Sequence, residues 1–176
     1  MNRISLIISA VLVAIFAVSC SHSKKMTKQH HKDLQDVYTT LKNEMPEALV
    51  TMSGERVKVV LPESVLFKVN DAELNKEYLP ILQKMATVLN KYDKTMILIT
   101  GHTDITGTEA RNMELSKQRA ENAKKVFIDF KVKESRMYTW GRGATEPVSD
   151  NNTETGRKQN RRVEYIIMYD YKPETE

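Results

Sequence analysis

Residues 97–108 read ILITGHTDITGT, an apolar run that ends at Gly101 and continues into His102, Thr103 and Asp104. A short, strongly apolar run predicts a buried strand. A strand that ends in this way presents its next polar residues at an exposed sheet edge. Three interpretations of His102 and Asp104 follow. They could form a metal or catalytic pair, Asp104 could hold a ligand, or the segment could be a polar turn.

Helical and strand patterns alternate on both sides of this stretch. We expect a helix from Leu34 to Met45, a hairpin over residues 48–62 with its turn at Ser53–Gly54, and a helix over residues 79–92 with Pro80 in its first turn. We then expect a helix over 108–130, a strand over 136–141, a polar loop over 143–160 and a last strand over 162–169. This alternation predicts a sheet with helices packed on it.

The first 19 residues have the composition of an export signal, with Arg3 followed by an apolar run and small residues before Cys20. The context AIFAVSC resembles a lipobox, which implies a lipid on Cys20, although Ala17 stands where a larger aliphatic residue is usual. Cleavage after Ser19 that leaves a free thiol is the alternative. Residues 20–46 then form a lipid-anchored linker with a short helix, and the polar residues 21–32 are its tether.

The overall charge excludes some functions. The chain of 176 residues carries +4, and one arginine lies within residues 1–19, so the mature chain is near +3. Acidic and basic residues are interspersed, which argues against nucleic-acid binding. A basic run in the last quarter is interpreted as solvated surface with some pairing; it contains Arg157, Lys158, Arg161 and Arg162.

Neither a metal site nor an enzyme is predicted. The adjacent His30 and His31 have no cysteine or carboxylate pair near them, and His102 with Asp104 lacks a third ligand in the sequence. No nucleophile stands beside a base, and no paired carboxylates have a clear role in a cleft. We expect no cofactor.

Arg119 breaks the pattern of the long helix over residues 108–130. The charged residues of this helix fall on one side, whereas Arg119 lies near the centre of the apolar side. A buried guanidinium needs partners, and its side chain leans toward the helix N-terminus, where Asp104 stands. Asp104 and Arg119 could form a structural salt bridge. They could instead clamp a zwitterion, with Asp104 accepting an ammonium and Arg119 holding a carboxylate. Spacing alone leaves both open.

These residues also carry a family pattern. The sequence TD, ten residues and then LSKQRA is similar to the peptidoglycan-binding signature of OmpA-like domains, a family that includes the peptidoglycan-associated lipoproteins. The later GRGATEPVSDNNTETGRKQNRRVEY and the earlier VLFKVNDAEL also resemble this family. The resemblance implies an α+β fold of the βαβαβ sandwich type, with helices packed on one small mixed sheet. It implies a domain over residues 47–170. The polar end KPETE predicts a frayed tail over 171–176.

The resemblance implies that the clamp binds the diaminopimelate side chain of peptidoglycan, with Asp104 on its ammonium and Arg119 on its carboxylate. It implies that Asn70 and Asn112 hydrogen-bond the ligand; their alternative roles are capping a loop and bonding at the helix start. Lys68 departs from the family, which often has aspartate there, and Arg142 replaces an aromatic or small residue.

The function expected on these grounds is non-covalent attachment of the cell wall to the outer membrane by a lipid-anchored, non-enzymatic domain that faces the periplasm. Envelope proteins are further expected partners. The first alternative is a structural or protein-interaction module of the same fold, in which Asp104 and Arg119 form only a salt bridge. The second is an enzyme that acts on peptidoglycan.

Overall fold

The computed structural model describes residues 28–67 and 72–171 of the chain, and residues 34–171 belong to one folded unit. Residues 28–33 belong to another unit and are helical, so helical backbone is already present before Leu34, where the helix was predicted to begin. Cys20, Lys68 and Asn70 lie outside the described residues. In the described part of the chain, no helix is both long enough and apolar enough to cross a membrane.

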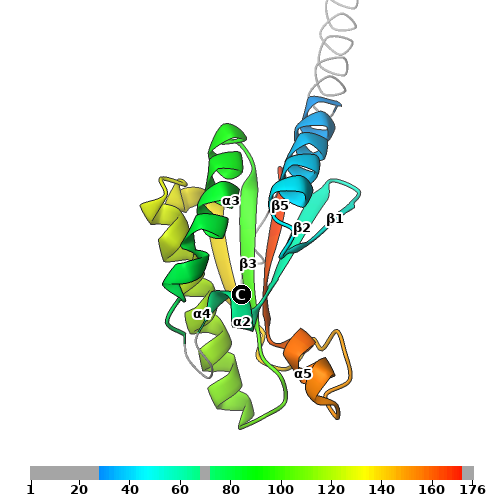
Figure 1. Ribbon diagram of the computed structural model, residues 1–176. Helices are drawn as coiled ribbons and strands as arrows, with labels where there is room; N and C mark the ends of the chain where they lie inside the picture. The colour runs from blue at the N-terminus through cyan, green and yellow to red at the C-terminus, as the bar shows by residue number, and fades with distance from the viewer. Residues whose placement is uncertain (1–27, 68–71, 172–176) are drawn as a thin grey trace, which may run out of the picture. The chain divides into compact units, whose positions relative to one another are not determined.

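Within the described residues, one five-stranded sheet is built from β1 (Leu49–Ser53), β2 (Arg56–Pro62), β3 (Met96–His102), β4 (Met137–Gly141) and β5 (Arg162–Met168). Its order is β1-β2-β5-β3-β4 (Figure 1). Only the pairing of β3 with β4 is parallel. The mixed sheet is therefore confirmed, and β3 is an interior strand as its continuous apolar run predicts.

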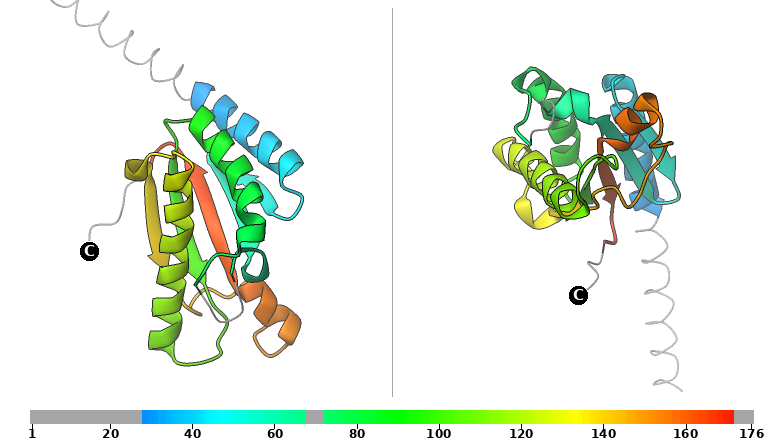
Figure 2. Two further views of the ribbon diagram at one scale, coloured as in Figure 1. Left: turned by 60° about the vertical axis from the view of Figure 1, so that its left-hand side comes forward. Right: turned by 90° about the horizontal axis from the view of Figure 1, so that it is seen from below.

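The helices are α2 (Glu63–Leu66), α3 (Leu79–Lys91), α4 (Glu109–Asp129) and α5 (Glu154–Asn160), with 3₁₀ turns η1 (Lys76–Tyr78) and η2 (Glu134–Arg136). Pro80 stands in the first turn of α3, where its missing N–H costs nothing. Figure 2 shows α3 and α4 lying against one face of the sheet. The alternating apolar residues of β2 and β5 point to this face.

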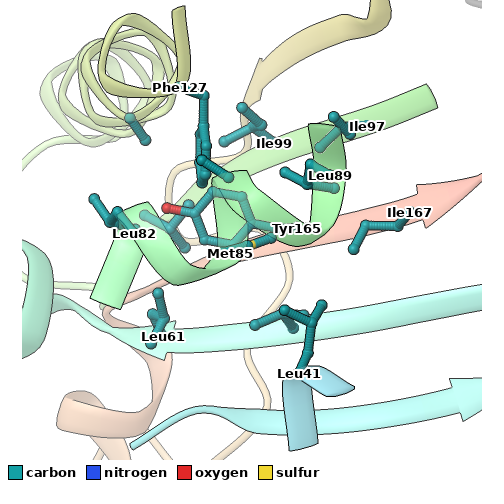
Figure 3. Packing of buried hydrophobic residues seen from close by; sticks show 14 of the residues in the cluster. Leu41, Leu61, Leu82, Met85, Leu89, Ile97, Ile99, Phe127, Tyr165 and Ile167 are labelled. Carbon is teal, nitrogen blue, oxygen red and sulfur yellow. The ribbon is translucent and has the colours of Figure 1, made fainter. Parts of the chain in front are cut away.

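The core lies between this face and the helices (Figure 3). Phe127 of α4 meets Tyr165 of β5 edge to face, with ring centroids 5.6 Å apart. The helical residues 34–44 contribute to the same core, because Leu34, Val37 and Leu41 are fully buried in it. These residues thus pack on the folded unit, and the core extends N-terminal to residue 47.

Two glycines bring α4 close to the strand ends. A Cβ atom on Gly101 would lie 2.1 Å from the carbonyl oxygen of Ser116, and one on Gly141 would lie 2.7 Å from the backbone nitrogen of Lys117. Both positions therefore require glycine. This close contact packs α4 against the ends of β3 and β4, one turn before Arg119.

The loop predicted over residues 143–160 is wrong in its last part, because α5 occupies residues 154–160. Thr153 caps this helix by accepting a hydrogen bond from the Gly156 backbone nitrogen at 3.0 Å. Asn160 fixes the other end, since its side chain bonds Val148, Ser149 and Asn151. Tertiary hydrogen bonds, rather than an apolar stripe, hold α5 in place.

Candidate functional site

A charged cleft of about 490 Å³ lies where β3 ends and α4 begins. Residues from α2, α4, α5 and the loop after β3 line it. Figure 1 shows α2, α5 and the first turn of α4 gathered at this end of the sheet. Asp104, Asn112 and Arg119 all line the cleft, so three residues expected at a ligand site lie together. Their roles toward a ligand stay predictions.

Asp104 is held by a tight loop. Its Oδ1 atom accepts a hydrogen bond from the Thr106 backbone nitrogen at 2.7 Å, and its carbonyl oxygen accepts one from the Asn112 side-chain amide at 3.2 Å. The Thr103 backbone nitrogen donates to the Gly143 carbonyl at 2.8 Å, which ties the loop to the end of β4. These bonds fix the Asp104 carboxylate beside the N-terminus of α4. Asn112 positions Asp104 through the bond to its carbonyl oxygen.

Arg119 is the largest fully buried side chain among the described residues and is 2% exposed. Its guanidinium lies 5.3 Å from the centre of the Phe67 ring, a cation–π contact, and it forms an ion pair with Glu63. Glu63 begins α2 and is itself 8% exposed. A buried guanidinium with a buried carboxylate partner avoids the cost of an uncompensated charge.

Arg161 connects the two acids. Its Nε atom lies 2.7 Å from Glu63 Oε2, and its Nη1 atom lies 2.5 Å from Asp104 Oδ2. Arg119, Glu63, Arg161 and Asp104 therefore form a chain of alternating charges along the cleft. Asp104 and Arg119 are joined through Glu63 and Arg161, an arrangement that differs from both the simple salt bridge and the two-residue clamp that spacing suggests.

The electrostatics of the cleft favour the charged forms of Asp104 and Arg161 and oppose that of Arg119. Burial raises the pKa of Asp104, but hydrogen bonds from Thr106 and Arg161 outweigh burial, so its pKa lies below the ordinary value. Burial lowers the pKa of Arg119, and attraction to Glu63 offsets only part of this effect, so the pKa lies below its ordinary value. Burial also lowers the pKa of Arg161, but its bonds to Asp104 and its attraction to Glu63 raise the pKa overall. The cleft thus offers fixed positive and negative charges side by side.

Sequence reasoning missed Glu63 and did not place Arg161 in the cleft. Glu63 follows a strand in PESVL and carries no periodic signal. Arg161 belongs to the basic run that is interpreted as solvated surface with some pairing. The pairing is present, but Arg161 also lines the cleft, and Arg162 is buried against Glu164 at 2.7 Å. The interpretation holds better for Lys158, which is exposed. Only the β2–β5 register, which pairs Pro62 with Arg162, brings Glu63 and Arg161 together.

The other candidates have structural surroundings. His102 is buried at the end of β3, with Arg162 opposite it on β5. Arg142 stacks on Trp140 at 4.3 Å from the ring centre and pairs with Glu146 at 3.3 Å. Within residues 28–67 and 72–171, no group of three or more histidine, cysteine or acidic residues is placed to hold a metal ion.

The mixed sheet with helices packed on it defines a small α+β domain. The OmpA family model matches residues 66–161, more than half of the chain, and the chain belongs to the OmpA family. It is 36% identical over 138 residues to the probable lipoprotein YiaD of Escherichia coli, covering 78% of this chain and 63% of that protein. The chain thus spans less than two thirds of that relative.

Two further comparisons agree with membership of the OmpA family. The chain is 27% identical over 173 residues to the peptidoglycan-associated lipoprotein of Buchnera aphidicola, covering 96% of this chain and 98% of that protein. The solved structure of the cell wall anchor of the T6SS from Pseudomonas aeruginosa superposes with a TM-score of 0.69 at 28% identity, covering 76% of this chain and 97% of that one. The family and these relatives place the chain among non-enzymatic domains.

Proposed function

We propose that this chain binds peptidoglycan non-covalently through diaminopimelate and anchors the outer membrane to the cell wall. The observation that carries the proposal is the cleft, in which Asp104 and Arg119 present opposite fixed charges beside the start of α4. Diaminopimelate ends in an ammonium and a carboxylate on one carbon atom. Relatives named as a peptidoglycan-associated lipoprotein and a cell wall anchor support the choice of ligand.

In this mechanism Asp104 accepts hydrogen bonds from the ligand ammonium, and Arg119 donates to the ligand carboxyl group. The ligand ammonium and Arg161 both contact the Asp104 carboxylate. The side-chain amide of Asn112 holds the loop that carries Asp104 in place. Asn112 also lines the cleft and can meet the ligand directly, and Asn70 is proposed as a second hydrogen-bonding residue. Backbone N–H groups at the start of α4 add donors for negative charge.

The affinity of one site should be modest. Two charge-assisted contacts of about 1.5–3 kcal/mol each correspond to a dissociation constant of roughly millimolar to tens of micromolar. Attachment of Cys20 to the outer membrane would raise the effective concentration of the domain near a repeating polymer. Many weak links then hold the two layers together while single links exchange.

Sedimentation with purified, insoluble cell wall tests the proposal. The full chain in mild detergent should sediment with the wall, and Asp104→Ala and Arg119→Ala should remain in solution while keeping native circular dichroism. If the folded wild type stays in solution, the domain is an interaction module with a structural charge network. Release of soluble wall fragments would instead reveal an enzyme.

A further inference from the structure

We propose that Glu63 sets the ligand preference of the cleft, favouring diaminopimelate whose carboxyl group is amidated over diaminopimelate with a free carboxylate. This inference rests on the proposed function, because it concerns the ligand group that lies against Arg119. It assigns a role in recognition to a residue that carries no signal in the sequence.

Glu63 already pairs with the two guanidinium groups, of Arg119 and Arg161, that a ligand carboxylate would need. One of its carboxylate oxygens pairs with Arg119, and the other lies 2.7 Å from Arg161 Nε. A ligand carboxylate that approaches either guanidinium therefore meets the negative charge of Glu63 at close range. Like charges at such a distance disfavour each other.

A carboxamide matches the same surroundings. Its oxygen can accept a hydrogen bond from Arg119, and its NH₂ group can donate to Glu63, whereas a carboxylate has only acceptors. The ligand ammonium is unchanged between the two forms, so Asp104 does not discriminate between them. The pair of Glu63 and Arg119 thus offers one acceptor and one donor, which is the complement of an amide.

Glu63 is held firmly enough to discriminate. Its backbone nitrogen donates to the Arg161 carbonyl at 2.9 Å, and its carbonyl accepts from the Phe67 backbone nitrogen at 2.8 Å. Its side chain lies between two guanidinium groups and is mostly buried. Moving it aside would separate the buried Arg119 from its carboxylate partner, which is costly.

The test is a pair of calorimetric titrations on the full chain in detergent. The ligands are two muropeptides that differ only in a free or an amidated diaminopimelate carboxyl group. The variant is Glu63→Gln, which keeps the shape and removes the charge. The matched control is Glu154→Gln, because Glu154 also lines the cleft and contacts Arg161 at 3.4 Å but is mostly exposed.

The quantity to compare is the dissociation constant for the free form divided by that for the amidated form. In Glu63→Gln this ratio should fall at least about tenfold, since the like-charge contact is removed. In Glu154→Gln it should stay within about twofold, because exposed charges are screened.

Native circular dichroism confirms that each variant is folded. An unchanged ratio in folded Glu63→Gln would overturn the inference, as would weaker binding of the free form, because Glu63 would then be a partner of the ligand ammonium. Failure of the folded wild type to bind either muropeptide would overturn the proposed function itself, and the inference with it.

Discussion

Lowering the pH from 7.5 to 5 should destabilise the folded chain through His102. This side chain is 1% exposed, and neither ring nitrogen has a hydrogen-bond partner among the described residues. Burial, reinforced by the positive charge of Arg162, lowers the pKa of His102 from 6.5 to about 4. The imidazole is therefore neutral in the folded chain at neutral pH.

The size of the effect follows from the two pKa values. Below pH 6.5 the unfolded chain takes up a proton on His102, whereas the folded chain stays unprotonated until the pH approaches 4. The unfolded state binds more protons in this window, so stability falls as the pH falls. Between pH 7.5 and pH 5 the loss in free energy of unfolding is about 2 kcal/mol.

Urea denaturation of the wild type and His102→Gln at both pH values measures this loss. Glutamine does not titrate, so the variant reports the pH dependence of all other groups. The wild type should lose about 2 kcal/mol more than the variant on going from pH 7.5 to pH 5. Equal losses in the two proteins would show that His102 keeps an ordinary pKa and would refute the reasoning.

Three further predictions concern the core, the helix contact and the anchor. Leu41→Ala should lower the free energy of unfolding by about 2–5 kcal/mol, because Leu41 is fully buried. Leu49→Ala, at a 64% exposed position, should change it by less than about 0.5 kcal/mol. Equal effects of the two substitutions in urea denaturation would contradict the packing of residues 34–44. Gly101→Ala forces a methyl group into the backbone of α4. It should lower the melting temperature by more than Gly54→Ala, where only the positive φ of 55° opposes a side chain. A larger loss in Gly54→Ala than in Gly101→Ala would contradict the close contact. Cys20→Ala should move the chain from the membrane fraction to the soluble fraction, and unchanged fractionation would exclude lipid attachment at Cys20.

Periodic patterns were sufficient to locate the main helices and strands, because the burial of α3, α4, β2 and β3 follows local residue spacing. The seven residues of α5 escaped notice because they contain no apolar stripe, and its two buried residues are Gly156 and Asn160. Its position depends on a cap and on bonds from Asn160 to a distant loop, which local spacing cannot reveal.

The candidate site was predictable in part for a similar reason. Arg119 was identifiable because a charge on the apolar side of a helix requires a partner, and the lean of its side chain pointed toward Asp104. Glu63 and Arg161 each stand at the boundary of an element, where no period applies. Their meeting depends on strands that pair across about 100 residues of sequence, as Pro62 and Arg162 do.

The most direct test of the account is a calorimetric titration of the full chain with a diaminopimelate muropeptide, beside Asp104→Ala and Arg119→Ala. The wild type should bind saturably, with a dissociation constant of roughly millimolar to tens of micromolar. Both variants should keep native circular dichroism and lose binding. Absence of binding by the folded wild type, or unchanged binding by the folded variants, would contradict the assignment of this cleft to the cell wall.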